Sequence, residues 1–232
     1  MIKEAIILAG GLGKRMGDSD RPKWLIPIAD TTIAQYQVKW LSRQGIKGVY
    51  VTMNRHFFPF VPQYFTSYPR PQLDLSPEII WEDKLSGDEG SLKGALDYLE
   101  GDDALVINCD ILTDLDLSLL PPAPALVVVH PRAPWGVLSE LVHGDNMTIR
   151  YPDWALEEKP TLPIWVSSGI YYFPKSIRDE LVDNGMLAEN IIPKLLKEGR
   201  LNIYKYEGLW HAIETPKDVE EASRILNERD LP

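Results

Sequence analysis

An aliphatic run near the amino terminus, residues 5–9, stops at a pair of glycines, Gly10 and Gly11. A short run that is apolar at every position is typical of a strand buried on both faces, as the strands of parallel sheets are. Similar runs alternate with segments of helical periodicity through the first half of the chain. We expect strands at 5–9, 48–53, 79–81 and 104–107, and helices between Thr32 and Gly45, at 59–65 and at 91–99. This alternation predicts an α/β fold with a mostly parallel, mixed sheet flanked by helices.

The second half of the chain has a different character, because prolines cluster around a further aliphatic run at 125–130. Proline lacks the N–H that a central strand donates, so the regular parallel pattern is expected to end here. We expect longer, irregular strands over 136–173, followed by helices at 175–182, 188–198 and 216–228. Residues 1–232 are interpreted as a single domain, in which residues 1–115 form a half of alternating strands and helices. Residues 116–232 would add an antiparallel wall and closing helices.

Acidic residues outnumber basic ones, 34 to 24, which gives a formal net charge of -10. Such a charge repels nucleic acids and anionic membranes, so neither is an expected partner. The single cysteine, Cys109, excludes an internal disulfide, and it has no histidine or second cysteine beside it in the sequence to suggest a zinc site. The apolar runs are too short for a signal sequence or a membrane span, so we expect a cytoplasmic protein.

The residues after the first strand carry the most informative pattern. Gly10, Gly11 and Gly13 would let backbone N–H groups approach phosphate oxygens without a Cβ in the way. Basic residues gather here in an otherwise acidic chain, at Lys14, Arg15, Arg21 and Lys23. Phosphate is therefore the expected ligand, although a glycine turn after a strand can also be purely structural. Two common phosphate motifs are absent, because the dinucleotide spacing needs a glycine at Met16 and the P-loop needs one at Leu8.

The pattern Leu-Ala-Gly-Gly-x-Gly-x-Arg-Met, followed by Pro-Lys-x-Leu-x-Pro-Ile, resembles the signature loop of the sugar-1-phosphate nucleotidyltransferases, or NDP-sugar pyrophosphorylases. The resemblance extends over nearly the whole chain. It is greatest to small members such as heptose- or hexose-1-phosphate guanylyl- and uridylyltransferases. It implies a Rossmann-like fold, with residues 1–115 as the nucleotide-binding half and residues 116–232 as the sugar-phosphate-binding half. It also implies nucleotide contacts from Leu8, Gly10, Gly11 and Gly13, and catalytic roles for Arg15 and Lys23.

The same loop is also similar, through Arg15-Met16-Gly17, to cytidylyltransferases of the isoprenoid and molybdenum-cofactor pathways. The loop alone therefore identifies the superfamily better than it identifies the substrate.

Two further stretches of the first half match the family. Residues 108–110 read Asn-Cys-Asp and resemble the strand-end Asn-Gly-Asp, which implies that Asp110 is catalytic, contacts the nucleotide and binds Mg²⁺. An acid just past a parallel strand also lies where open α/β sheets bind ligands, although a turn or cap role is the alternative. Residues 86–92 resemble Leu-Gly-Thr-Ala-Gly-Ala/Ser-Leu, which implies that Gly87 lines the nucleobase. The two acidic residues after Gly87 depart from that pattern and leave the preferred nucleotide open.

The second half carries three weaker matches. Glu158-Lys159-Pro160 resembles a motif whose acid contacts sugar hydroxyls and whose lysine contacts the sugar phosphate, although a surface ion pair is the alternative. A stretch that begins at Ser168 and Gly169 is similar to the strand that closes the sugar pocket. Gly136 matches a glycine that lies against the sugar ring. Together these matches imply substrate contacts from Gly136, Glu158, Lys159, Ser168 and Gly169.

Residues 210–218 resemble Trp-x-Asp-Ile-Gly-Thr-Pro-Glu-Asp, but the family's second metal-binding aspartate aligns with Ala212. Alanine cannot bind a metal ion. Glu214 lies two positions on, and in an extended segment it would point to the same side. We therefore hypothesise that Glu214 and Asp110 hold Mg²⁺, as the Glu-Ile-Asp of choline-phosphate-type cytidylyltransferases suggests.

These features predict nucleotidyl transfer from a nucleoside triphosphate to a sugar 1-phosphate, with release of pyrophosphate, in a protein that could form a homo-oligomer. Three alternatives stay open. The first is a CTP-dependent cytidylyltransferase acting on phosphocholine or a polyol phosphate. The second is a catalytically weak, nucleotide-sugar-binding regulatory subunit, as Ala212 would suggest. The third is an α/β binding protein without transferase activity. The nucleotide and the sugar are not predicted.

Overall fold

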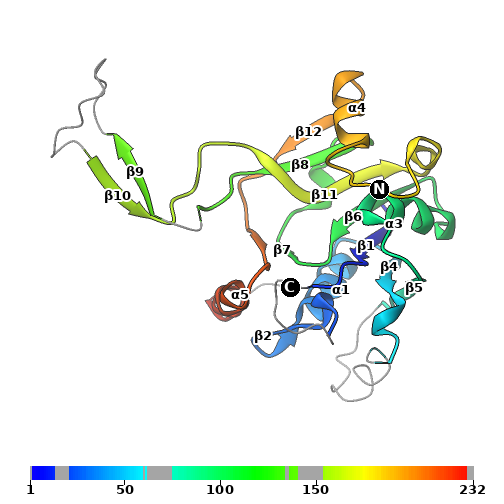
Figure 1. Cartoon of the computed structure of the whole chain (residues 1–232), viewed down its shortest axis with the longest axis horizontal. Coiled ribbons are helices and arrows are strands. Elements are labelled where there is room, and N and C mark those ends of the chain that lie inside the picture. The colour runs from blue at the N-terminus through cyan, green and yellow to red at the C-terminus, as the bar shows by residue number, and fades with distance from the viewer. Residues whose placement is uncertain are drawn as a thin grey trace.

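The computed structural model describes residues 2–13, 21–59, 61, 75–133, 136–140 and 154–228, and for 136–140 and 154–158 it describes the backbone alone. A seven-stranded sheet runs through the molecule in the order β12-β8-β11-β6-β1-β4-β5 (Figure 1). Its strands are β1 (Glu4–Ala9), β4 (Gly48–Asn54), β5 (Glu78–Glu82), β6 (Asp103–Asn108), β8 (Ala125–Val129), β11 (Val166–Pro174) and β12 (Asn202–Lys205). Neighbouring strands are parallel except for β11, which runs antiparallel to β6 and β8. The expected mostly parallel, mixed α/β sheet is therefore confirmed.

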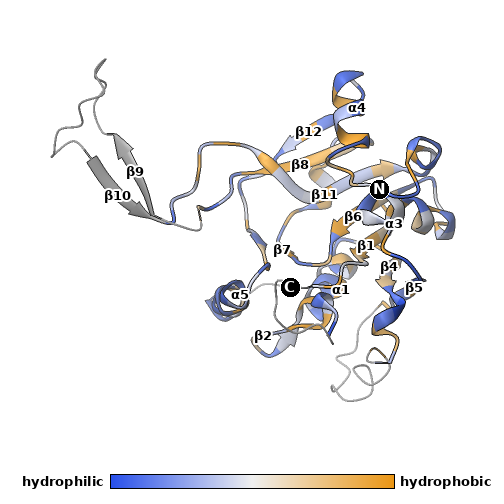
Figure 2. Ribbon diagram, in the orientation of Figure 1, coloured by the Kyte–Doolittle hydropathy of each residue, from blue (hydrophilic) through white to orange (hydrophobic). Residues whose placement is uncertain are grey.

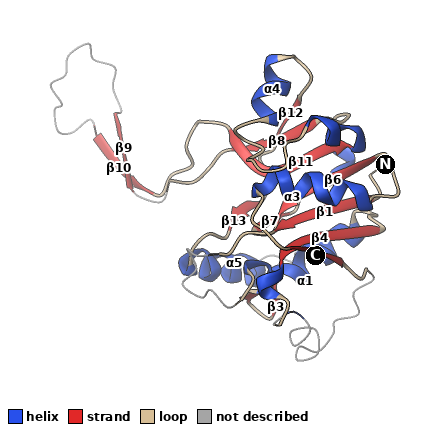
Figure 3. Cartoon of the chain, turned by 45° about the vertical axis from the view of Figure 1, so that its right-hand side comes forward, coloured by secondary structure: helices blue, strands red, loops and turns tan. Residues whose placement is uncertain are grey.

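Strand β1 shows how the two faces of the sheet are covered. All six of its residues are buried, and successive side chains enter two different hydrophobic clusters. Ile6 and Leu8 share a cluster with residues of α3 (Gly87–Ala95) and α4 (Ile191–Lys197). Ile7 shares the other with residues of α1 (Ile33–Arg43) and α5 (Pro216–Glu228). Helices thus lie on both faces (Figure 3), and the most hydrophobic residues gather in the strands (Figure 2).

Helix α1 begins and ends where the sequence predicts. The Thr32 hydroxyl accepts a hydrogen bond of 3.2 Å from the Gln35 N–H and so caps the first turn. Gly45 follows the helix with φ of +83°, a left-handed conformation that only glycine adopts without strain.

The second half of the chain adds strands to the same sheet. Strand β8 lies inside the sheet rather than at its edge, because the prolines flank its five residues and do not interrupt them. Strand β11 contains a register shift between Ser167 and Tyr171, with Gly169 at φ of +74°. The shorter pairs are β9 (Gly136–Glu140) with β10 (Trp154–Glu158), β7 (Ile111–Thr113) with β13 (Trp210–Ala212), and β2 (Pro27–Ile28) with β3 (Thr31–Thr32).

Some expected elements differ from those observed. Residues 175–180 form a 3₁₀ helix and not the α-helix expected at 175–182, since the chain becomes extended at Leu181. Helix α4 begins at Ile191 and not at 188, because the backbone of Asn190, with φ of -116° and ψ of -82°, is not helical and separates the turn at 187–190 from the helix. The helix expected at 59–65 falls mostly outside the described residues. Within the described part of the chain, no helix is both long and apolar enough to cross a membrane.

Candidate active site

Strands β1 and β6 bring two of the predicted segments to one edge of the sheet. They are parallel neighbours with Leu8 opposite Asn108, so Gly10 and Asp110 follow at the same, carboxyl end. The Cys109 N–H donates to the Leu8 carbonyl at 3.1 Å and extends this pairing past the end of β6. Ligand sites of open α/β sheets lie at this edge.

Lys23 and Asp110 meet at this edge. Lys23 Nζ lies 2.6 Å from Asp110 Oδ2, although the two residues are 87 positions apart in the sequence. Their side chains are 16% and 20% exposed, so the pair is partly shielded from water and still open to a ligand. Lys23 begins a 3₁₀ helix, Lys23–Leu25, whose next two residues are buried and anchor it. A lysine and a carboxylate at this distance form a charge-assisted hydrogen bond.

The glycine loop has two constrained positions among its described residues. A Cβ at Gly10 would lie 2.3 Å from Glu82 Oε2, so the missing side chain makes room for that carboxylate. Gly13 has φ of +60°, the left-handed region. Leu8 thus lies in β1, and Gly10, directly after the end of that strand, lies beside Glu82. Arg15 lies outside the described residues.

Glu82, at the end of β5, is a residue that the sequence reasoning missed. Burial raises the pKa of its carboxyl group, and a hydrogen bond of 3.3 Å from the Ser86 hydroxyl partly opposes that rise. The acid at the end of a strand beside a glycine loop is the signal that could have found it.

The turn at Gly87 is held by the segment 182–190. A Cβ at Gly87 would lie 2.0 Å from the Gly185 carbonyl oxygen, and φ is +70°. Glu89 is 1% exposed and accepts hydrogen bonds from the Val182 N–H at 3.2 Å and the Asn190 side-chain amide at 2.9 Å. The acidic residues that depart from the family pattern therefore bind this segment, since the Asp88 carboxylate also accepts from the Leu187 N–H at 2.7 Å.

The register shift in β11 lies beside the end of β6. Ser168 is 1% exposed, and its hydroxyl donates to the Val127 carbonyl at 2.8 Å and accepts from the Ile170 N–H at 3.2 Å. Its side chain is thus used within the fold. A Cβ at Gly169 would lie 2.7 Å from Asn108 Nδ2. This glycine therefore lies beside Asn108, which comes two residues before Asp110 in the sequence.

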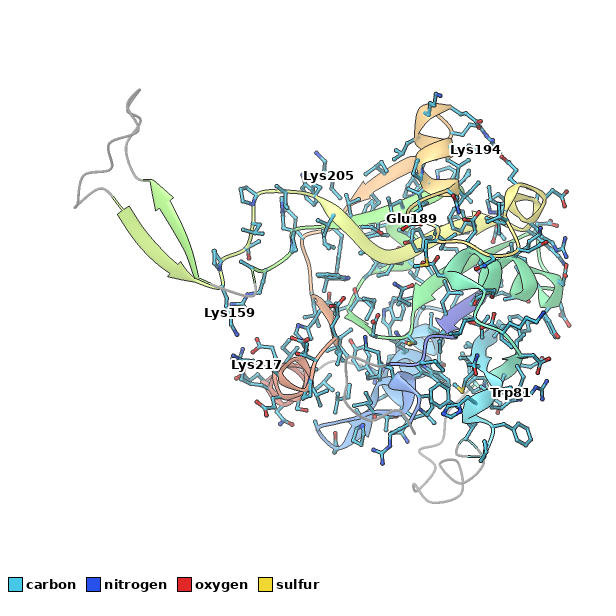
Figure 4. All side chains as sticks on the ribbon, in the orientation of Figure 1. Trp81, Lys159, Glu189, Lys194, Lys205 and Lys217 are labelled. Atoms are coloured by element: carbon cyan, nitrogen blue, oxygen red, sulfur yellow. The ribbon has the colours of Figure 1, made fainter. Side chains whose placement is uncertain are left out.

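The remaining sugar-half residues lie on β9, β10 and the segment that follows. Gly136 is paired with Glu158 in the β9–β10 ribbon. Lys159, which Figure 4 labels on the segment between β10 and β11, has φ of +51°, a strained conformation for a residue other than glycine. The Lys159 carbonyl accepts a hydrogen bond of 3.4 Å from Arg132 Nε, and Arg132 Nη1 lies 3.5 Å from Glu221 of α5.

Glu214 lies in the segment that runs beside Asp110. The Ile213 N–H donates to the Asp110 carbonyl at 2.9 Å, and Ala212 pairs with Ile111. Ile213 is fully buried and Glu214 is exposed, as expected for an extended segment that alternates. The backbone of Glu214 is fixed, because its N–H donates to Asp218 Oδ2 at 3.1 Å. No cluster of three or more metal-binding side chains occurs within the described ranges.

A family model, the MobA-like NTP transferase domain, matches residues 5–120, the stretch that contains the glycine loop, Lys23 and Asp110. The chain belongs to this family. The resemblance to sugar-1-phosphate nucleotidyltransferases is thereby confirmed.

Curated relatives of this chain agree with the family assignment. The bifunctional protein GlmU of Methanocaldococcus jannaschii is 28% identical over 235 residues, covering 96% of this chain and 54% of the relative. A mannose-1-phosphate guanyltransferase of Neurospora crassa is 25% identical over 231 residues, covering 93% of this chain and 62% of the relative. The chain therefore spans little more than half of the length of these curated relatives.

The fold also matches a solved structure. HddC of Yersinia pseudotuberculosis has a TM-score of 0.73 against this chain at 21% identity, and the match covers 97% of this chain and 100% of that one. At this level of identity the likeness concerns the fold alone, and it confirms the nucleotide-diphospho-sugar transferase-like architecture.

Proposed function

We propose that this nucleotidyltransferase joins a nucleoside triphosphate to a sugar 1-phosphate and releases pyrophosphate. The observation that carries the proposal is the contact of Lys23 with Asp110 at the ligand edge of the sheet. Each residue comes from a separate motif of the family, and the fold places their charged groups 2.6 Å apart. The named relatives and the family model support the same reaction.

The reaction is a displacement at phosphorus. A phosphate oxygen of the sugar 1-phosphate attacks the α-phosphorus of the triphosphate, and the bond from that phosphorus to the bridging oxygen of pyrophosphate breaks. Two anions must approach each other, so positioning and charge neutralisation are the protein's main tasks. Lys23 and Arg15 would neutralise the reacting and leaving phosphates, and the amides of Gly10, Gly11 and Gly13 would contact the nucleotide together with Leu8 and Gly87.

The acidic residues fit a divalent ion. Asp110 and Glu214 would hold it, because carboxylate oxygens are the ligands that Mg²⁺ prefers. When bound, Mg²⁺ would neutralise triphosphate oxygens. Lys23 already contacts Asp110, so the lysine would exchange this carboxylate for a phosphate when substrate binds.

The second half would bind the sugar phosphate. Lys159 would contact the phosphate and Glu158 the sugar hydroxyls, with Gly136 and Gly169 against the ring. Ser168 would contribute its backbone, since its hydroxyl is already bonded within the fold. A single domain over residues 1–232, a cytoplasmic location and assembly into a homo-oligomer stay predictions.

A pyrophosphate-release screen tests the proposal. It crosses the four common nucleoside triphosphates and dTTP with a panel of sugar 1-phosphates, a polyol phosphate and phosphocholine, with and without Mg²⁺. We expect a Mg²⁺-dependent signal with one sugar 1-phosphate. Pyrophosphate release with phosphocholine or the polyol phosphate alone would favour the cytidylyltransferase alternative. No release with any substrate pair, in a protein that still binds nucleotide sugars, would favour the regulatory alternative.

Lys23→Ala gives the matching residue test. We expect kcat to fall about 10²- to 10³-fold with little change in KM, because the lysine is assigned to charge that develops in the transition state. Lys194→Ala is the control, since Lys194, which Figure 4 labels on α4, forms a comparable ion pair of 2.7 Å with Glu180 and belongs to none of the motifs of the candidate site. A loss confined to KM would contradict the role given to Lys23.

A further inference from the structure

Gln37 is a fully buried polar residue on the core side of α1. A buried side-chain amide is costly unless its donors and its acceptor find partners. Gln37 finds three. Its Nε2 donates to the carbonyl oxygens of Asn108 and Ile111, at 3.0 Å each, and its Oε1 accepts from Trp24 Nε1, also at 3.0 Å.

These three partners belong to the two segments that form the candidate active site. Asn108 and Ile111 are the residues on either side of the Cys109–Asp110 turn. Trp24 is fully buried and follows Lys23 in the 3₁₀ helix. One amide therefore attaches both the Asp110 turn and the Lys23 helix to α1, at the point where their side chains meet.

We propose that Gln37 is a positioning residue that sets the distance and orientation between Lys23 and Asp110. It acts through the backbone of the turn and through Trp24, and it does not contact substrate. The catalytic part of this inference rests on the proposed nucleotidyl transfer, while the structural part does not.

The chemistry of the site explains why an amide is needed here. The carbonyls of Asn108 and Ile111 require two N–H donors, and the indole N–H of Trp24 requires an acceptor. A primary amide supplies two donors and one acceptor in one plane. Glutamate has the same shape, but it lacks the two donors and would face the carbonyls with oxygen. Methionine would leave two carbonyls and one indole N–H without partners.

Gln37→Met and Gln37→Glu, purified as the full chain, provide the kinetic test. We expect kcat to fall about 10- to 100-fold, because small displacements of catalytic groups cost this much, while KM for both substrates stays within about twofold.

Tyr36→Phe is the matched control. Tyr36 is the neighbouring residue of α1, and its hydroxyl donates to the Thr113 carbonyl at 2.9 Å, so the variant also removes a buried hydrogen bond between α1 and the β7 segment. We expect it to lower Tm and to leave kcat within twofold of wild type. Equal losses of kcat in Tyr36→Phe and Gln37→Met would overturn the proposal, as would an unchanged kcat in both Gln37 variants.

If the Gln37 variants do not fold, Trp24→Phe takes their place. It removes the indole N–H that donates to Gln37 Oε1, and we expect a smaller drop in kcat of about threefold to tenfold. A wild-type kcat in a folded Trp24→Phe protein would then count against the proposal.

A second readout is independent of activity. The rate at which acetic anhydride modifies Lys23 is measured by mass spectrometry of tryptic digests, with Lys194 of the same molecules as the internal standard. We expect Lys23 to be modified several-fold faster in Gln37→Met than in wild type, because its contact with Asp110 loosens. An unchanged ratio would refute the positioning role. A changed ratio in a protein that releases no pyrophosphate would refute the proposed reaction and leave the positioning role standing.

Discussion

Single side chains decide the chemistry at the edge of the sheet where β1 and β6 end. The Lys23–Asp110 pair joins a cation to a carboxylate that would otherwise repel an incoming triphosphate. The chain is acidic overall, with a net charge of -10, so the proposed binding of a triphosphate would depend on local basic groups such as Lys23.

A substitution at Glu214 tests whether this residue is the second carboxylate that holds Mg²⁺. In Glu214→Ala we expect the Mg²⁺ concentration for half-maximal activity to rise about tenfold or more, as loss of a metal-supporting group does. Glu220→Ala, an exposed acid in the following helix, is the control and should behave as wild type. A Mg²⁺ titration of pyrophosphate release measures both, and coincident curves would remove Glu214 from the metal site.

A substitution at Gly169 tests whether the contact between β11 and β6 matters for activity. Gly169→Ala combines a left-handed backbone with a Cβ 2.7 Å from Asn108 Nδ2, so it should cost about 1–2 kcal/mol in unfolding free energy and also lower activity. Gly199→Ala meets the same backbone penalty, at φ of +66°, with no described atom within 4 Å of its Cβ. Urea titrations should show a loss of stability for both variants, the larger one for Gly169→Ala, and only Gly169→Ala should lose activity. Equal activities would separate Gly169 from the site.

At the scale of elements, ion pairs link one helix to the next. The 3₁₀ helix Lys175–Glu180 is joined to α4 and to Arg200, which lies three residues past the end of α4. Glu180 accepts from Lys194 at 2.7 Å and from Arg200 at 2.5 Å. These cations lower the pKa of Glu180 to about 2.

This lowered pKa predicts a pH-dependent contribution to stability. A carboxyl whose folded pKa is depressed stabilises the fold above its ordinary pKa, and the contribution disappears as pH falls toward the folded value. Glu180→Gln should therefore lower the free energy of unfolding by less than about 1 kcal/mol at pH 7, since the carboxyl group is partly exposed to solvent. This loss of stability should become smaller as the pH falls from 4.5 to 3, because the Glu180 carboxyl of the wild type begins to be protonated. Urea titrations across this range measure it, and a cost independent of pH would contradict the ion-pair explanation.

Local patterns predicted most elements and missed those that depend on distant partners. Strand β1 and helix α1 were predictable because periodicity, a cap and a terminal glycine are all local. Strands β12 and β13 were missed, since each is short and is defined by its pairing with β8 and β7. Gln37 was missed for the same reason, because its three partners lie in segments that only the fold brings together.

At the scale of the whole molecule, β11 joins the two halves of the chain. It lies between β6 of the first half and β8 of the second, in one continuous sheet. The candidate site at the edge formed by β1 and β6 therefore depends on a strand that comes much later in the sequence.

This arrangement predicts that the halves do not fold separately. A fragment of residues 1–115 should be largely unfolded or aggregated, because β6 would become an exposed, apolar edge strand. The full chain should unfold in one transition by both far-ultraviolet circular dichroism and tryptophan fluorescence. A fragment with native-like circular dichroism, or two separate transitions, would contradict the single-domain interpretation.

The close approach of Gly10 to Glu82 also bears on how this family diverges. Any side chain at position 10 would occupy the space that the carboxylate now fills, and a shorter residue at position 82 would vacate it. The two positions should therefore change together in related lineages. A homologue with alanine at position 10 should carry a smaller or differently directed residue at position 82, so the pair would distinguish branches of this family.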